Sequence, residues 1–176
     1  KHQVIEFLSD TGLDSLLEEA NKIRDLHWGK TITYSRKVFV PLTNMCRNTC
    51  SYCTFVKDPY SDEATILSKD QVINIIEEGQ KKGCKEVLFS LGEKPELRYP
   101  VARMALKRLG FNSMVHYLKE VCQLTLQNSN LIPHVNAGTL SLEDIKKLKP
   151  VTASMGMMLE TTSKRLTRKG QPHYAC

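Results

Sequence analysis

The segment RKVFVPLTNMCRNTCSYC, residues 36–53, places three crowded cysteines directly after a run of β-forming residues. The valines and phenylalanine of this run predict a strand over residues 36–42. Cys46, Cys50 and Cys53 follow within eight positions, in a C-x3-C-x2-C spacing. Because no secretory signal is expected here, such crowding indicates metal binding rather than disulfides. The sequence therefore predicts a metal-binding loop at the end of the first strand.

One helix is predicted before this loop, and helices alternate with strands after it. The apolar periodicity predicts an amphipathic helix over residues 13–27. Further segments are expected downstream: helices near 68–82, 100–108, 113–128 and after Ser141, strands near 86–91, 132–136 and 151–159, and a helical start near Thr161. A strand–helix pair repeated about four times predicts a parallel sheet with crossover helices.

This order favours an α/β fold, a partial βα barrel of about four βα units with an N-terminal helix. We expect residues 1–31 to form a helical extension and residues 32–176 to form the first half of the barrel. In such barrels the chemistry lies where strands end and loops begin. Apart from the cysteines, polar residues follow the predicted strands at Gly92-Glu93, Asn136 and Glu160.

Composition narrows the class of protein. The net charge is +6, from 25 basic and 19 acidic side chains, and the basic residues occur in short groups typical of solvated helix faces. No basic stripe with interleaved aromatics is present, so we expect no nucleic-acid partner. No apolar stretch approaches the ~20 residues of a membrane-spanning helix, so we expect no membrane partner and a cytoplasmic location. The chain starts at Lys1 and stops at Cys176, and we expect it to be a fragment.

The number of ligands separates two kinds of metal site. Three closely spaced thiolates reach three corners of a cubane iron–sulfur cluster and leave the fourth iron without a protein ligand. An open iron is what a cluster needs to coordinate a substrate or cosubstrate. Structural zinc would need a fourth ligand, for which His134 and His173 are candidates. The remaining cysteines, Cys84, Cys122 and Cys176, are scattered and are interpreted as buried or chance surface thiols.

The C-x3-C-x2-C loop after a first strand resembles the signature of the radical S-adenosylmethionine (SAM) superfamily. The resemblance implies a 4Fe–4S cluster whose open iron chelates SAM, and a 5′-deoxyadenosyl radical formed when SAM is cleaved. Tyr52 stands where this superfamily places an aromatic residue near the adenine. Gly92 and Glu93 resemble the motif that holds the SAM amino group.

Three more residues are candidates for SAM or substrate contacts on the same resemblance. Glu160 and Arg165 follow the fourth strand, where related enzymes place polar residues, and Asn136 follows the third. Each has an ordinary interpretation as well: a carboxylate at a helix N-terminus for Glu160, an exposed helix residue for Arg165 and a turn residue for Asn136. The methionines of residues 155–158 are expected to pack inside the barrel.

Longer segments carry a closer resemblance. ITYSRKVFVPLTNMCRNTCSYCTF, FSLGEKPE, LIPHVNAGTLS and SMGMMLETTSKRL are similar to the 7,8-didemethyl-8-hydroxy-5-deazariboflavin synthases, the deazaflavin-forming component of FO synthases. The similarity runs from about Ile32 to Tyr174. Between the first two cysteines that family usually has Arg-Asp-Arg or a similar run, where this chain has Arg47-Asn48-Thr49.

This resemblance implies a reaction in coenzyme F(420) biosynthesis. The substrate would be the adduct of a tyrosine-derived 4-hydroxybenzyl group and a ribityliminouracil, cyclised with loss of ammonia. Implied partners are the tyrosine–uracil coupling component, separate or fused, and an electron donor such as ferredoxin or flavodoxin. Two alternatives remain open: another radical SAM enzyme, such as the coupling component or a biotin-synthase-like enzyme, and a non-catalytic metal-binding module.

Overall fold

The computed structural model describes residues 12–174 and 176, which fall in two units that divide between Tyr34 and Ser35. In the first unit, helix α2 (Leu13–Trp28) begins after Gly12 and ends before Gly29. Its apolar side chains, including Leu13 and Trp28, are largely exposed. Among the described residues, no helix is both long and apolar enough to cross a membrane.

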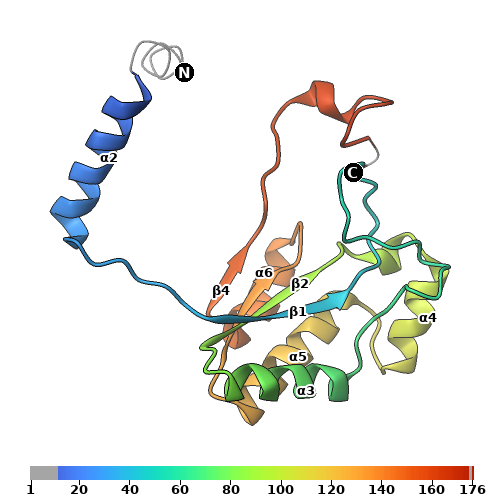
Figure 1. The fold of residues 1–176 in the computed structure, drawn as a ribbon. Coiled ribbons are helices and arrows are strands. Elements are labelled where there is room, and N and C mark those ends of the chain that lie inside the picture. The colour runs from blue at the N-terminus through green and yellow to red at the C-terminus, as the bar shows by residue number, and fades with distance from the viewer. Residues whose placement is uncertain (1–11, 175) are drawn as a thin grey trace. The chain divides into compact units, whose positions relative to one another are not determined.

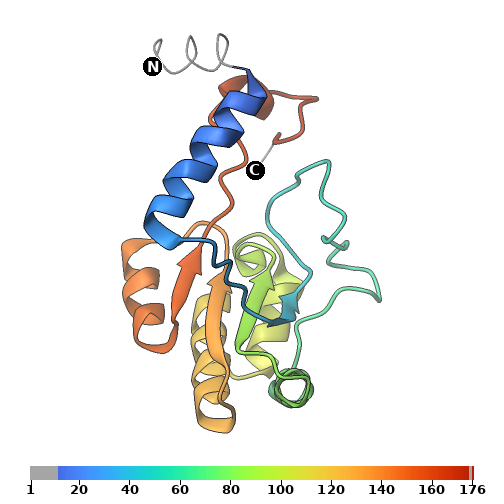
Figure 2. The same cartoon turned by 60° about the vertical axis from the view of Figure 1, so that its left-hand side comes forward.

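The second unit is built on a parallel sheet of four strands (Figure 2). The strands lie in sequence order: β1 (Lys37–Thr43), β2 (Glu86–Leu91), β3 (Ile132–Asn136) and β4 (Ser154–Gly156). Each pairs in parallel with the next. Parallel neighbours need a crossover, so every connection carries at least one helix. The alternation predicted from the sequence is confirmed.

Four helices supply these crossovers, and three 3-10 turns lie between the other elements or after β4. The helices are α3 (Lys69–Lys81), α4 (Pro100–Arg108), α5 (Met114–Asn128) and α6 (Leu142–Leu148), and the turns are η1 (Pro95–Leu97), η2 (Lys149–Val151) and η3 (Lys164–Thr167). Capping boxes start two of the helices, at Ser68 for α3 and at Ser141 for α6. In each box the side chain three residues on bonds back to the cap N–H, which fixes where the helix begins.

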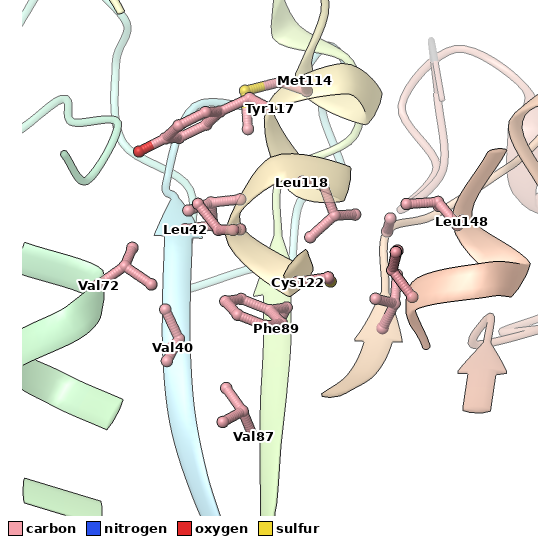
Figure 3. Close-up of a cluster of buried hydrophobic side chains, with 14 of the residues drawn as sticks. Val40, Leu42, Val72, Val87, Phe89, Met114, Tyr117, Leu118, Cys122 and Leu148 are labelled. Atoms are coloured by element: carbon pink, nitrogen blue, oxygen red, sulfur yellow. The ribbon is translucent and has the colours of Figure 1, made fainter. Parts of the chain in front are cut away.

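One face of the sheet carries the core (Figure 3). Alternate strand residues such as Val40 and Phe89 are fully buried and meet the apolar side of α5, where Leu118 and Cys122 are also buried. The Tyr117 hydroxyl at the edge of this cluster donates a hydrogen bond of 2.5 Å to the carbonyl of residue 67. Packing of α5 against β1 and β2 thus fixes these strands, and with them the loops at their carboxyl ends, relative to the core.

The opposite face of the sheet is more open. Phe39, Leu88, His134 and Ser154 form one row across the four strands, and Phe39 is 50% exposed. The His134 ring is hydrogen-bonded to the Ser154 hydroxyl within this row. His134 is therefore a hydrogen-bonded strand residue, as such single histidines usually are.

The fourth strand is shorter than predicted. The apolar run suggested residues 151–159, but β4 covers only Ser154–Gly156, because its ladder with β3 ends where β3 ends, at Asn136. Without a paired neighbour beyond that point the apolar run continues as irregular chain. Met155 packs against the core, whereas the next two methionines are 52% and 71% exposed, so their predicted burial is wrong for this chain. The helical start expected near Thr161 is the short turn η3.

Candidate functional site

The carboxyl ends of the strands gather the polar segments singled out by the sequence. The cysteine loop, residues 44–53, follows β1, and Gly92 and Glu93 follow β2. The Gly92 amide donates to the Thr43 carbonyl at 3.0 Å, so the two strand ends stay paired beyond the sheet. This pairing brings the glycine–glutamate segment against the start of the cysteine loop.

Cys46 is the most enclosed of the three loop cysteines, at 8% exposure. Its sulfur accepts backbone N–H bonds from Glu93 at 3.2 Å and from Asn48 at 3.4 Å. Burial raises the pKa of the Cys46 thiol, and these two donors act in the opposite direction. Hydrogen bonds of this kind stabilise negative charge on sulfur. The loop thus holds one sulfur in a fixed position suited to a thiolate ligand.

Gly92 permits this close approach because it has no side chain. A β-carbon at this position would lie 2.0 Å from the Met45 carbonyl oxygen and 2.8 Å from the Cys46 β-carbon. Both are parts of the chain that cannot rotate away. Glycine is therefore required where the end of β2 passes under the cysteine loop.

The Glu93 carboxylate joins the cysteine loop to the segment that follows β3. It is 8% exposed, forms an ion pair with Arg47 and accepts hydrogen bonds from Asn48 at 3.2 Å and Thr139 at 3.5 Å. A carboxylate has about four lone-pair directions, so three donors leave room for one more. Glu93 can consequently brace the loop and still accept a hydrogen bond from a cationic group of a ligand.

Replacing Glu93 with glutamine should loosen this loop. The amide keeps the shape of the side chain, but it removes the charge that pairs with Arg47. We expect the free energy of unfolding of the cluster-free protein to fall by about 1–3 kcal/mol, measured by urea denaturation. The loss stays below that of a fully buried pair because the Arg47 side chain is 37% exposed.

The exposed pair of Glu63 with Lys57 provides the matched control. Its side chains are 66% and 44% exposed, so water screens the pair and Glu63→Gln should leave the free energy of unfolding at the wild-type value. Equal losses for the two variants would show that the Glu93 ion pair contributes no more than a surface pair.

The other two loop cysteines are more open, and a distant segment lies against them (Figure 1). Cys50 is half-buried and Cys53 exposed. The Ser51 amide donates to the Pro172 carbonyl at 2.9 Å, and the Cys50 sulfur lies 3.0 Å from the Cys176 sulfur. Sequence reasoning missed this contact, because the two cysteines are 126 residues apart and share no spacing motif.

Tyr52, in the cysteine loop, lies near Glu160, which follows β4. Tyr52 is 51% exposed and meets the His173 ring edge to face, with 5.2 Å between ring centroids. The pKa of the Tyr52 hydroxyl is raised first by desolvation and then by the nearby Glu160 carboxylate. Glu160 and Arg165 are exposed, Arg165 on η3. Asn136 is half-buried at the last position of β3.

The donor set fits an iron–sulfur cluster held by one loop. Each thiolate of a cubane binds a different iron, so the ligands are spaced more widely than the ligands of a single ion. In the described part of the chain, the ligand atoms that lie within 4.8 Å of one another are those of Cys50, His173 and Cys176. Cys46, with its two N–H donors, stands outside this group and provides one fixed anchor for a larger group.

Comparison with known proteins agrees with this chemistry. The radical SAM superfamily model matches residues 40–174. The chain is 49% identical over 149 residues to an FO synthase of Nocardia farcinica, covering 82% of this chain and 17% of that protein. It is 43% identical over 142 residues to a 7,8-didemethyl-8-hydroxy-5-deazariboflavin synthase of Methanopyrus kandleri, covering 81% of this chain and 42% of that one. The chain thus spans less than half the length of these curated relatives.

A solved structure shares the fold. The crystal structure of a methylornithine synthase superposes with a TM-score of 0.66 at 17% identity, covering 96% of this chain and 46% of that chain. At this identity the likeness concerns the fold alone. It agrees with the α/β, partial-barrel architecture predicted from the order of strands and helices.

Proposed function

Since the chain belongs to the radical SAM superfamily, we propose that Cys46, Cys50 and Cys53 hold a 4Fe–4S cluster with one open iron for SAM. The observation that carries the proposal is the preformed environment of Cys46, whose buried sulfur accepts two backbone N–H bonds from the cysteine loop and the glycine–glutamate segment. When bound, the cluster supplies the electron that cleaves SAM to methionine and a 5′-deoxyadenosyl radical. The protein's own task is to position SAM and exclude water.

The residues around the cluster loop have distinct roles in this proposal. Glu93 accepts the SAM amino group on its remaining lone-pair direction while it keeps its bonds to Arg47 and Asn48. Tyr52 presents an exposed aromatic ring for the adenine. Three further residues are proposed contacts to the rest of SAM or to the substrate. Asn136 is the last residue of β3, and Glu160 and Arg165 follow β4.

For the substrate, we infer the reaction of the curated relatives with 43–49% identity. This is the cyclisation of 5-amino-5-(4-hydroxybenzyl)-6-(D-ribitylimino)-5,6-dihydrouracil to 7,8-didemethyl-8-hydroxy-5-deazariboflavin, with loss of ammonia. The coupling component would supply the substrate, and a ferredoxin or flavodoxin in the cytoplasm would supply the electron. The chain spans 42% or less of those two relatives. The proposed reaction and its substrate pocket are therefore those of the whole protein, in which the coupling component is either fused or separate.

Anaerobic reconstitution with iron and sulfide tests the proposal in two steps. The first expected result is a brown protein with about four irons that cleaves SAM when reduced. The second is formation of a fluorescent deazaflavin, with release of ammonia, when the hydroxybenzyl–ribityliminouracil adduct is added to the whole protein. Iron analysis measures the cluster content. Chromatography measures the products formed from SAM and from the adduct.

The outcomes separate the candidate functions. SAM cleavage without deazaflavin from the adduct would overturn the substrate assignment and favour another radical SAM reaction. A colourless protein carrying one zinc and no iron after reconstitution would overturn the cluster itself. It would instead support a non-catalytic metal-binding module.

A further inference from the structure

We propose that Cys50, His173 and Cys176 form a binding site for a single zinc ion when the cluster is absent. The thiol sulfurs and one ring nitrogen of these residues all lie within 4.8 Å of one another. Only Cys50 belongs to the C-x3-C-x2-C loop, and the other two come from the end of the described chain. The site is therefore distinct from the proposed cluster site but shares one ligand with it.

The chemistry of the trio matches zinc. Zinc takes thiolate sulfur at about 2.3 Å and imidazole nitrogen at about 2.0–2.1 Å in tetrahedral geometry, so its ligand atoms lie about 3.3–3.8 Å apart. The present spacing, with 3.0 Å between the two sulfurs, allows all three atoms to reach one ion after small side-chain movements. Two sulfurs this close cannot occupy two corners of a cubane, where each would bind a different iron. A water molecule would complete the zinc coordination.

Two hydrogen bonds between the cysteine loop and residues 172–174 hold the two halves of the site together without any metal. The Ser51 amide donates to the Pro172 carbonyl at 2.9 Å, and the Thr49 hydroxyl donates to the Tyr174 carbonyl at 2.7 Å. The His173 ring is oriented by its edge-to-face contact with Tyr52. Because these bonds flank Cys50 and His173, much of the ordering that metal binding requires is already made.

Shared use of Cys50 makes zinc and the cluster competitors, a consequence that rests on the proposed function. Zinc binds nitrogen and sulfur ligands more tightly than ferrous iron does. Zinc bound by Cys50 leaves only Cys46 and Cys53 of the loop thiolates for iron. Zinc should therefore lower the yield of cluster assembly. This loss should require Cys176, because Cys176 helps to hold the zinc on Cys50.

A zinc titration of the cluster-free protein against a chromophoric chelator, under anaerobic reducing conditions, tests the site. We expect the wild type to bind one zinc, and Cys176→Ser and His173→Ala each to weaken the Kd by at least about tenfold, because each removes a ligand. Cys53→Ser, a loop thiol outside the trio, should change the Kd by less than about twofold. Cys176 is exposed, so its replacement leaves the core intact. An unchanged Kd in Cys176→Ser, or an equal loss in Cys53→Ser, would overturn the proposed site.

A second measurement tests the competition. One equivalent of zinc added before iron and sulfide should lower the cluster yield of the wild type, measured as protein-bound iron, but not that of Cys176→Ser. Equal yields with and without zinc in the wild type would overturn the competition for Cys50. If the wild type assembles no cluster even without zinc, the proposed function fails while the titration still decides the zinc site.

Discussion

Replacement of Cys46 with serine is expected to abolish assembly of the iron–sulfur cluster and, with it, the cleavage of SAM. Cys46 is the buried member of the three, and its sulfur is held by N–H donors from Asn48 and Glu93. Serine presents a hard oxygen that remains protonated at neutral pH, whereas iron–sulfur clusters select soft thiolates. Two remaining thiolates hold a cubane poorly. Iron and sulfide content after anaerobic reconstitution, and 5′-deoxyadenosine released from SAM, measure the effect.

The control for this variant is Cys84→Ser. Cys84 is half-buried beside α3 and lies outside the cysteine loop, so its replacement should leave iron content and SAM cleavage at the wild-type level. A Cys46→Ser protein that retained about four irons and cleaved SAM would contradict the assignment of Cys46 as a ligand.

Gly92→Ala should displace the cysteine loop and remove most of the bound iron. The new β-carbon would lie 2.0 Å from the Met45 carbonyl oxygen, so either the loop or the end of β2 must move. Movement in either direction breaks the N–H bond from Glu93 to the Cys46 sulfur. We expect the free energy of unfolding to fall by about 1–3 kcal/mol, as in other overpacked positions, and iron content to fall with it. Urea denaturation and iron analysis measure the two effects.

The matched control is a glycine with free space around it. A β-carbon on Gly156 would lie no closer than 3.9 Å to its nearest neighbour, the Nε2 atom of His134, which is ordinary van der Waals contact. Gly156→Ala should therefore keep wild-type stability and iron content. If Gly92→Ala behaved in the same way, the close passage of β2 under the loop would not matter for the site.

Strong local signals account for the parts of the fold that were predicted correctly. Ser68 and Ser141 begin helices because their side chains cap the first N–H groups, a property of four consecutive residues. The mostly apolar run of residues 86–91 forms β2, with Val87 and Phe89 buried in the core and the alternate residues half-buried on the other face. The fourth strand was predicted too long because its extent depends on the length of β3, its neighbour, and not on its own sequence.

The candidate site also has features that the sequence predicted and features that only the fold decided. The spacing of the three cysteines predicted a metal-binding loop, and the resemblance to the radical SAM superfamily added the glycine–glutamate segment after β2. The sequence did not show that Glu93 pairs with Arg47, or that Cys176 lies 3.0 Å from Cys50. Both contacts join residues far apart in the chain, and no local pattern encodes them.

The sequence by itself thus determined the α/β order, the helix starts and the cysteine loop, because each follows from interactions within a few residues. Only the tertiary structure decided which strand ends meet and how the Glu93 carboxylate is shared. It also decided that residues 171–174 lie against the cysteine loop. These features depend on the pairing of β1 with β2 and on the contact of residues 171–174 with the cysteine loop. The residues that stabilise them are far apart in the sequence, and only the fold brings them together.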